Sequence, residues 1–256
     1  IDQLSYPIIA ISVYLQEFLS TKPLAKKLEA LFEQTAEDGK RTLDVPNIDS
    51  VAFRHVCFGY GDAAPLLNDF SLTVNAGEKC IITGQSGSGK STSMNLLLGY
   101  YEPRSGEILI NGANAFCVKG LNERIAIMRQ DPVLFNDTLR NNLTMYRDMG
   151  DDELIALLQK LNLSKFASRE GLNAIISEGG SNLSGGERKR IALARTLLRK
   201  APITIIDEPL ANVDSETAEK IEDILSELSG GIVFVITHHF SEDKKKAFAK
   251  ELRLRA

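Results

Sequence analysis

Cysteine is scarce in this sequence, and what there is excludes a scaffold built on cysteine. The 256 residues include three cysteines, Cys57, Cys80 and Cys117. Their number is odd, no two of them form a C-x-x-C pair, and their spacing fits no zinc site. A chain of this length buries roughly 70–75% of its unfolded surface on folding, so it needs no disulfide or metal for stability. We therefore expect reduced, buried thiols in a cytosolic protein.

Basic residues are not in excess either. Lys and Arg number 30 and Asp and Glu number 34, which gives a formal net charge of −4. Because proteins that coat nucleic acid usually carry a basic excess, we expect no nucleic-acid partner. The sequence has 43% hydrophobic and 25% charged residues and no internal repeat, which excludes a disordered, collagen-like or coiled-coil chain.

A hydrophobic run long enough to cross a membrane is also lacking. The most apolar stretch, residues 7–19, is interrupted by Gln16 and Glu17 and falls short of the roughly 20 residues that a spanning helix needs. Asp2 precedes it, where a signal peptide would carry basic residues. Three lysines follow soon after it, as they do on the cytoplasmic side of a membrane helix. On these residues alone, a core helix and the end of a transmembrane helix both remain open for residues 1–34.

Hydrophobic patterning divides the rest of the chain. Residues 35–50 lack periodicity and are rich in turn formers, so we predict a linker there. From residue 51 onward, strand patterns alternate with helical patterns of about a dozen residues, which indicates a parallel sheet in an α/β domain. Asp151 and Asp152 are predicted to cap one of the helices. The strands of the sheet are expected at residues 80–83, 203–206 and 232–236.

A glycine-rich segment carries the first chemical signal. Residues 84–91 fit the pattern G-x-x-x-x-G-K-[ST] and lie between an apolar strand and a helical pattern. Glycines allow backbone N–H groups to fold around phosphates, and the helix N-terminus adds its dipole. Lys90 is expected to reach the β- and γ-phosphate oxygens, and the Ser91 hydroxyl to bind Mg²⁺. The predicted ATP-binding residues of this loop are Gly84, Gln85, Ser86, Gly87, Ser88, Gly89, Lys90, Ser91 and Thr92.

Two acidic residues end a later apolar strand. Asp207 and Glu208 close the run at residues 202–208. Beside a phosphate-binding loop, Asp207 is predicted to hold Mg²⁺ or its water shell. Glu208 is then predicted to take a proton from the attacking water, or to orient it. Taken alone, this pair is a common entry to a loop, and the phosphate-binding loop in the same chain favours the catalytic interpretation.

A second phosphate-binding pattern opens a later helix. Ser184, Gly185, Gly186 and Glu187 precede a basic helical segment, where free backbone amides and the positive end of the helix dipole form an anion site. Two such sites in one chain suggest a nucleotide that is clamped from two sides. Ordinary helix capping is the alternative interpretation.

Together, these motifs resemble the nucleotide-binding domain of ABC transporters. The resemblance covers roughly residues 51–239, and LSGGE at residues 183–187 resembles the signature of that family. It implies a P-loop NTPase (RecA-like) α/β fold with a parallel sheet core, an antiparallel β subdomain and an inserted α-helical signature subdomain. The ATP-binding domain is then expected at residues 51–256, with the helical subdomain at about 136–194. The signature is expected to act in trans, on the ATP of a partner domain.

The resemblance also implies roles for four other residues. Tyr60 looks like the aromatic residue that stacks on adenine, and Gln130 looks like the Q-loop glutamine, which touches Mg²⁺ and the attacking water. Asp214 ends a segment that looks like the D-loop, and His238 looks like the switch histidine that contacts the γ-phosphate. The implied catalytic residues are Glu208, His238 and Gln130, and the implied metal ligands are Ser91, Gln130 and Asp207.

Two segments narrow the resemblance to exporters. Residues 130–135 and 177–180 are similar to the Q-loop and the X-loop of ABC exporters, in which the ATPase domain follows the last transmembrane helix. Residues 1–34 then fit the cytoplasmic end of that helix. The implied function is binding and hydrolysis of ATP, with Mg²⁺, to power export of an unknown substrate. The implied partners are a transmembrane domain and a second nucleotide-binding domain, at the cytoplasmic face of the cell (inner) membrane.

Other functions remain as alternatives. A detached ATPase subunit of an importer leaves residues 1–34 unexplained, and a non-transport ABC ATPase usually carries coiled coils or two cassettes. A non-hydrolysing regulator would be expected to lack Glu208 or His238, and both are present. A simple P-loop kinase would not be expected to contain the LSGGE segment.

The chain departs from the family pattern at two places. Residues 211–214 read Ala-Asn-Val-Asp, where the D-loop usually reads Ser-Ala-Leu-Asp, and this leaves its serine contact across a dimer unsupported. After His239 the family usually adds another strand, and the sequence predicts none here. Lysines 244–246 are expected to form a solvated surface, and His55, which lies in no motif, is expected to be structural.

Overall fold

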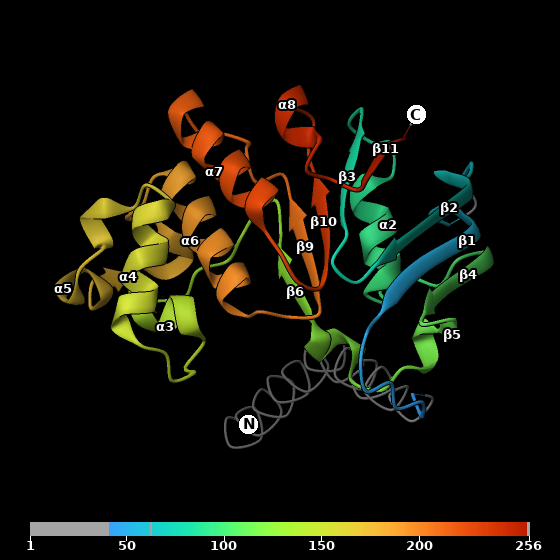
Figure 1. Cartoon of the computed structure of the whole chain (residues 1–256), viewed down its shortest axis with the longest axis horizontal. Helices are drawn as coiled ribbons and strands as arrows, with labels where there is room; N and C mark the ends of the chain where they lie inside the picture. The colour runs from blue at the N-terminus through green and yellow to red at the C-terminus, as the bar shows by residue number, and fades with distance from the viewer. Residues whose placement is uncertain (1–40, 62, 255–256) are drawn as a thin grey trace, which may run out of the picture.

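The computed structural model describes residues 41–61 and 63–254, which form three parts side by side (Figure 1). A five-stranded parallel sheet lies in the middle, with a four-stranded antiparallel sheet on one side and a group of helices on the other. This arrangement confirms the predicted α/β P-loop fold. Within the described residues, every helix is too short or too polar to span a bilayer. The predicted membrane segment, residues 1–34, lies outside the described residues.

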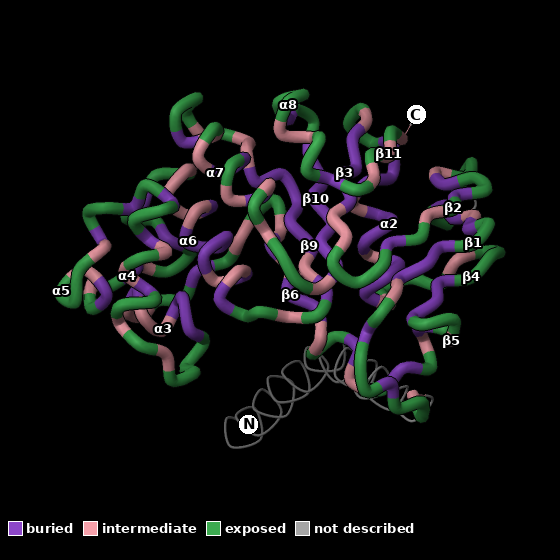
Figure 2. Tube along the Cα trace, viewed as in Figure 1, coloured by how far each residue is buried: buried purple, intermediate pink, exposed green. Residues whose placement is uncertain are grey.

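The parallel sheet has the strand order β11-β3-β10-β9-β6. All five residues of β10 are buried, and Figure 2 shows the inner strands as mostly buried. Continuous apolar strands are typical of a parallel sheet that is covered on both faces. Because Ile236 of β10 pairs with Ile82 of β3 and with Asp207 of β9, the residues that follow these strands meet at one edge. The strands are β3 (Lys79–Gly84), β6 (Ile125–Met128), β9 (Ile203–Asp207), β10 (Ile232–Ile236) and β11 (Lys250–Leu254).

The antiparallel sheet has the order β2-β1-β4-β5 and covers one face of the parallel sheet. Helix α2 (Lys90–Leu97) lies between the two sheets, and its Met94 and Leu97 share a core with Phe53 and with Phe234 of β10. Residues 41–49 pack on this core through Val45 and Ile48, and Leu43 forms a bridge with Val118. The strands are β1 (Ser50–Phe58), β2 (Leu67–Asn75), β4 (Ser105–Ile110) and β5 (Ala113–Asn114).

Helices cover the other face of the parallel sheet. Ile191 of α6 and Ile221 of α7 share a second core with Ile81, Ile206 and Val235 of the sheet. The helices of this side are α3 (Leu139–Thr144), α4 (Asp151–Lys160), α5 (Arg169–Leu172), α6 (Gly185–Leu198), α7 (Ser215–Glu227) and α8 (Glu242–Lys245). Short pieces complete the chain: β7 (Asp137–Thr138), β8 (Ile175–Ile176) and the 3₁₀ helices η2 (Ala115–Cys117), η3 (Leu121–Arg124), η4 (Ser164–Phe166) and η5 (Glu178–Gly180).

The predicted cap of α4 is wrong. Gly150 occupies the N-cap position and makes no side-chain cap, whereas Asp151 and Asp152 lie in the first turn. The carboxylate of Asp151 pairs with Arg140, and its second oxygen lies 3.6 Å from Arg169 Nε. These ion pairs hold the side chain away from the backbone N–H groups. The two aspartates still favour the helix through its dipole.

The expectations for the C-terminal segment are also wrong. The chain adds a further strand, β11, which pairs in parallel with β3. Lys245 is only 16% exposed, because its ammonium lies between Glu242 (2.7 Å) and Glu251 (3.1 Å). Lys244 is paired with Asp223 at 2.6 Å, so the predicted solvated surface is reduced to Lys246.

The prediction of buried thiols holds for one cysteine. Cys80 is buried in β3, and burial raises the pKa of its thiol to about 12. Cys57, on the inner strand β1, is half-buried, and Cys117, at the end of the 3₁₀ helix η2, is exposed.

Candidate active site

The glycine-rich loop connects β3 to α2, and its backbone requires glycine. Gly84, Gly87 and Gly89 have φ values of +152°, +80° and +93°. Gly89 is the N-cap of α2, and a Cβ there would come within 2.8 Å of Leu67 Cδ2. Glycine therefore allows the loop to reach the helix start with its amides unobstructed, which is the arrangement that binds phosphate.

Lys90 lies inside this loop. Its side chain is buried, and its ammonium donates hydrogen bonds to the carbonyl oxygens of Gly84 (2.9 Å) and Gln85 (2.8 Å). Burial lowers the pKa of Lys90, while the nearby charges of Glu208 and Asp207 raise it. The loop thus holds a positive charge at the place where the motif predicts phosphate oxygens.

Two buried carboxylates face the loop from the end of β9. Asp207 and Glu208 are each 7% exposed, and burial raises the pKa of both. A hydrogen bond from Ser91 opposes this effect at Asp207, and the charge of His238 opposes it at Glu208. Among the described residues, Asp207 Oδ1 and Glu208 Oε1 accept no hydrogen bond, although His238 Nε2 lies 3.2 Å from Glu208 Oε1 outside hydrogen-bond geometry. A buried oxygen that accepts no hydrogen bond costs free energy of folding. These carboxylate oxygens therefore suit a divalent cation and its water as ligands.

The backbone at Glu208 is unusual. Its φ of +51° lies in the left-handed region, which is uncommon for residues other than glycine and costs of order 1 kcal/mol or more. Its N–H donates to the carbonyl of Ile236 at 2.9 Å, which fixes this conformation against β10. Strained backbone of this kind is concentrated at functional sites.

His238 approaches the same carboxylate from the end of β10. Its Nε2 lies 3.2 Å from Glu208 Oε1, at the distance of an ion pair. The neighbouring Thr237 donates from its N–H to the carbonyl of Ile82 (3.2 Å) and from its hydroxyl to the carbonyl of His239 (2.8 Å). The imidazole of His238 is therefore held beside Glu208 by a well-anchored loop.

A cavity of about 340 Å³ joins these groups. Tyr60 stands at its rim, where its hydroxyl bonds to the Thr92 hydroxyl (3.1 Å) and its ring packs edge-on against Phe58 and Tyr101. Leu66 also lines the cavity, and no motif pointed to it. The lining consists of Tyr60, Leu66, Ser86, Gly87, Gly89, Lys90, Ser91, Thr92, Gln130, Glu208 and His238.

The signature residues do not line this cavity. Ser184 is the N-cap of α6 and accepts a hydrogen bond from the N–H of Glu187 (3.2 Å), whose carboxylate accepts from the N–H of Ser184 (2.9 Å). Ser184 and Glu187 therefore form a reciprocal capping box at the start of their own helix. Gly185 is exposed, and a Cβ there would meet only Arg188 at 3.9 Å. The start of α6 is therefore open on its outer side.

The predicted D-loop lies next to the signature. Asp214 is the N-cap of α7 and accepts a hydrogen bond from the N–H of Thr217 at 2.9 Å. A Cβ on Gly186 would lie 3.5 Å from the carbonyl oxygen of Asn212 and 3.6 Å from Val213. The starts of α6 and α7 therefore form one continuous surface outside the cavity.

Comparison with known proteins identifies the family. Residues 67–211 match the family model described as ABC transporter, which is more than half of the chain. The chain belongs to the ABC transporter family. This match confirms the family that the sequence motifs predict.

Several relatives of this ABC domain carry names of transporters. The ATP-dependent lipid A-core flippase of Syntrophus aciditrophicus is 37% identical over 80% of this chain, which covers 35% of that protein. The glutathione/L-cysteine transport system ATP-binding/permease protein CydD of Bacillus subtilis is 36% identical over 80% of this chain and 36% of its own length. The mitochondrial iron-sulfur clusters transporter ATM1 of Debaryomyces hansenii is 41% identical over 67% of this chain and 25% of its own length.

A solved structure agrees with these relatives. A bacterial Atm1-family ABC exporter with ATP bound matches with a TM-score of 0.69 and 33% identity, over 84% of this chain and 40% of that one. The ABC domain described here thus spans less than half the length of the proteins it matches.

The sequence analysis missed one buried lysine at the site of this ABC domain. Lys189 lies on α6 and donates from its ammonium to the carbonyl of Glu208 at 3.4 Å. Burial lowers the pKa of Lys189, and the charges of Asp131, Glu208 and Asp207 raise it. In the sequence it is one of several basic residues in a helical pattern, so no local signal singled it out.

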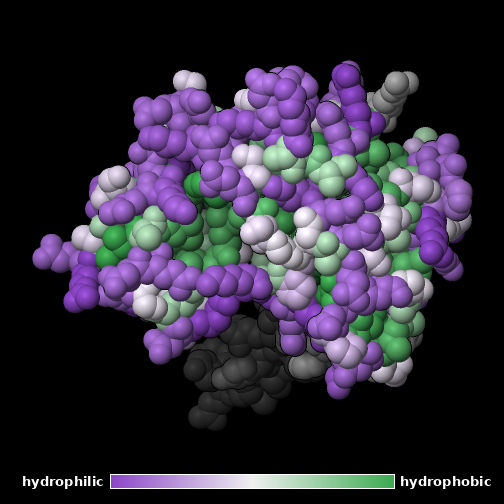
Figure 3. Space-filling view, viewed as in Figure 1, coloured by the Kyte–Doolittle hydropathy of each residue, from purple (hydrophilic) through white to green (hydrophobic). Residues whose placement is uncertain are grey.

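A second surface groove lies away from the sequence motifs. A groove of about 410 Å³ runs between α4, α6 and α7, and Figure 3 shows apolar side chains on that part of the surface. Glu153 and Lys200 form an ion pair at 2.7 Å on its rim. Its lining, all from the described residues, contains neither a glycine-rich loop nor a buried carboxylate oxygen without a hydrogen bond, so we assign the nucleotide to the P-loop cavity.

Proposed function

We propose that this ABC domain binds and hydrolyses Mg-ATP in the P-loop cavity and thereby powers an exporter. The observation that carries the proposal is the pair of buried carboxylate oxygens on Asp207 and Glu208 that accept no hydrogen bond and lie near the charge of Lys90. Carboxylates, a lysine and a glycine-rich loop together suit phosphoryl transfer to water. The whole protein would then export a substrate that this domain does not select.

The residues of the site divide the tasks of binding and catalysis in this proposal. Ser91, Asp207 and Gln130 would hold Mg²⁺, which neutralises charge on the β- and γ-phosphates when it is bound. Lys90 binds the phosphate oxygens, and Tyr60 stacks on the adenine. Glu208 takes the proton of the attacking water or orients it, since a raised pKa makes a buried carboxylate a better base.

His238 is proposed to contact the γ-phosphate and to keep Glu208 in place. Its position 3.2 Å from Glu208 Oε1 supports both tasks, because one imidazole can bridge the carboxylate and a phosphate oxygen. Loss of His238 is therefore expected to slow hydrolysis more than it weakens ATP binding.

A second ABC domain is the proposed partner at the signature. Ser184, Gly185 and Gly186 lie outside the cavity of their own chain, and Gly185 is exposed. An open helix N-terminus can accept the phosphates of another chain's ATP. We propose a head-to-tail dimer that encloses two ATP molecules.

A transmembrane domain is the proposed second partner. Val133, Phe135 and Ile175 are large apolar side chains, and each is about half exposed or more. They belong to or adjoin the segments that are similar to the exporter Q-loop and X-loop, and exposed apolar side chains suit a protein interface. We propose that this surface contacts the transmembrane domain at the cytoplasmic face of the membrane.

The ATPase assignment has a direct test. The purified chain is expected to hydrolyse ATP only with Mg²⁺. Glu208→Gln should retain ATP binding and lose roughly 10²–10⁴-fold in turnover, as expected for a general base. Lys90→Ala should weaken binding and turnover together. Full turnover in Glu208→Gln would refute the assignment.

The exporter assignment is tested separately. The reading frame upstream of residue 1 should encode several apolar spans in the same polypeptide, as an exporter requires. A start codon directly upstream, with no such spans, would instead favour a detached importer subunit or a non-transport ATPase.

A further inference from the structure

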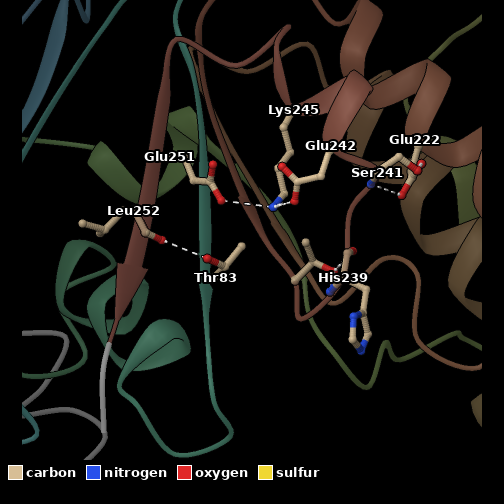
Figure 4. A network of polar contacts seen from close by, with 9 residues as sticks. Thr83, Glu222, His239, Ser241, Glu242, Lys245, Glu251 and Leu252 are labelled. Carbon is tan, nitrogen blue, oxygen red and sulfur yellow. Dashed lines mark hydrogen bonds and ion pairs between the residues drawn. The ribbon is translucent and has the colours of Figure 1, made fainter.

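Glu222 is a buried carboxylate that lies outside the nucleotide cavity and in none of the motifs. It sits on α7 and is only 6% exposed. Its Oε1 accepts the N–H of Ser241 at 3.0 Å and its Oε2 accepts the Ser241 hydroxyl at 2.5 Å (Figure 4). Lys244 Nζ lies 3.8 Å from the same carboxylate. A buried charge requires such partners, so this contact is a built anchor rather than a chance surface contact.

The anchor holds the loop that carries His238. Residues 237–241 connect β10 to α8, and Thr237 fixes the first end through its bond to the Ile82 carbonyl at 3.2 Å. Glu222 fixes the other end at Ser241. His238 lies between the two anchors, with its Nε2 3.2 Å from Glu208 Oε1. A displacement at either anchor therefore moves the imidazole relative to the catalytic carboxylate.

The same helix begins at the D-loop. Asp214 caps α7, and Glu222 lies eight residues further along, at about 12 Å for a rise of 1.5 Å per residue. A helix transmits displacement along its axis with little internal change. The position of the D-loop and the position of the His238 loop are thus linked through one rigid element.

We propose that Glu222 is a positioning residue for His238, and that through α7 it links the D-loop to the catalytic glutamate. The proposal rests on the proposed function, because it takes His238 to act on the γ-phosphate. Its chemistry is a pair of charge-assisted hydrogen bonds, and no bond to substrate is involved.

The first test separates rate from binding. Glu222→Ala should lower kcat for ATP about tenfold or more, since small misplacements of catalytic groups have effects of this size. The Kd for ATP should stay within about twofold, because the P-loop and Tyr60 belong to other elements. Glu222→Gln retains an oxygen acceptor for Ser241 and should recover most of the rate. A raised Kd with unchanged kcat would overturn the proposal.

A neighbouring residue supplies the matched control. Asp223 lies on the same helix and pairs with Lys244 at 2.6 Å, but its side chain is largely exposed and does not touch Ser241. Asp223→Ala should therefore leave kcat within about twofold of the parent. An equal loss in Asp223→Ala and Glu222→Ala would mean that the effect arises from α7 in general, and the proposal would fail.

A double-mutant cycle asks whether Glu222 acts through His238. In a His238→Ala background, Glu222→Ala should cost less than about twofold in kcat, because two residues that act as one unit are not additive. The same loss in both backgrounds would show a general structural role and overturn the proposal. The kcat values in the His238→Ala background are measured on the ATPase activity that Glu208 still supports when His238 is absent.

Hydrogen exchange provides a readout that needs no ATPase activity. In Glu222→Ala, the amides of residues 237–241 should exchange faster, while those of the P-loop should stay unchanged. Unchanged exchange at Ser241 would overturn the proposal. If the parent chain lacks ATPase activity, the proposed function fails, and the exchange result still decides whether Glu222 anchors the loop.

Discussion

Lys189 of α6 donates a hydrogen bond to the backbone carbonyl of Glu208 across 3.4 Å. The helix that opens with the signature therefore contacts the residue that we propose as the general base of its own chain. Both partners are buried, and Glu208 holds a left-handed φ of +51°. An ammonium at this carbonyl stabilises that conformation, because the interior strengthens a charge-assisted hydrogen bond.

Replacing Lys189 by methionine is expected to slow hydrolysis without weakening ATP binding. Lys189→Met removes the donor and keeps the length of the side chain, so the carbonyl of Glu208 loses its partner in a buried site. We expect kcat to fall about tenfold, which corresponds to about 1.4 kcal/mol. Steady-state kinetics and ATP binding, measured together, check this. Arg188→Met, which removes a charge from the same helix without touching Glu208, is the control and should retain most of the rate.

Tyr60 is expected to contribute to affinity through its ring. Because base stacking on an aromatic side chain is worth roughly 1–3 kcal/mol, Tyr60→Ala should raise the Kd for ATP about tenfold or more. Tyr60→Phe loses only the 3.1 Å hydroxyl contact to Thr92 and should bind nearly as well as the parent. GTP should compete with ATP within about a factor of ten, since stacking tolerates every base. Calorimetric titration checks these values, and equal affinity in Tyr60→Ala would disprove stacking.

The predictable part of the site is the part that is local in sequence. The glycine-rich loop and the carboxylates that end β9 each lie in one short segment, where strand, turn and helix signals agree. Their meeting also follows from the topology, because parallel strands bring Gly84, Asp207 and Thr237 to one edge of the sheet. A contiguous motif on a parallel sheet can therefore be recognised without coordinates.

Tertiary contacts account for what the sequence analysis missed. Lys189 and Glu222 gain their importance from contacts 19 residues away, at Glu208 and Ser241, and neither contact leaves a local pattern. Strand β11 was missed because its alternating charged residues suit the edge of a sheet, where the pattern resembles a polar loop. Ion pairing also competed with the expected cap at Asp151.

The capping box at the signature gives a pH-dependent stability. Burial alone would raise the pKa of Glu187, but the hydrogen bonds from Lys165 and Ser184 outweigh it and hold the pKa below its usual value. A lowered pKa in the folded state means that the carboxylate stabilises the fold fully above the unfolded pKa of about 4.5. This contribution is lost as the pH falls from there through the folded pKa.

Glu187→Gln is expected to reveal that contribution. Glutamine retains the reciprocal bond of a capping box but not the ion pair with Lys165, so the variant should be less stable at pH 7 by up to about 1 kcal/mol. The difference from the parent should shrink as the pH falls below about 4.5. Denaturant unfolding at several pH values between 7 and 3 measures it. A difference that stays constant or grows on acidification would contradict the assignment.

ATP-dependent dimerisation is the sharpest test of the signature. Glu208→Gln is expected to retain ATP, so Mg-ATP should shift this variant from monomer toward dimer by mass action, since the proposed dimer encloses the nucleotide at its interface. A variant that also carries Gly185→Glu should stay monomeric. A side chain at Gly185 has open space, with Arg188 as its nearest neighbour at 3.9 Å, and a carboxylate in the first turn favours the helix dipole. The monomer is therefore expected to keep its stability, while the new charge repels the phosphates of a partner's ATP.

Light scattering with and without Mg-ATP measures the dimer, and thermal unfolding verifies that both variants are folded. ATP binding to the monomer should be equal in the two, because Gly185 does not line the P-loop cavity. If Glu208→Gln remains monomeric at high concentration with ATP bound, either the signature does not act in trans or the Ala-Asn-Val-Asp segment weakens the interface; restoring Ser-Ala-Leu-Asp at residues 211–214 separates these two causes. If Gly185→Glu still dimerises with ATP, the helix N-terminus of α6 is not the clamp, and the contact between two domains must be made by other residues.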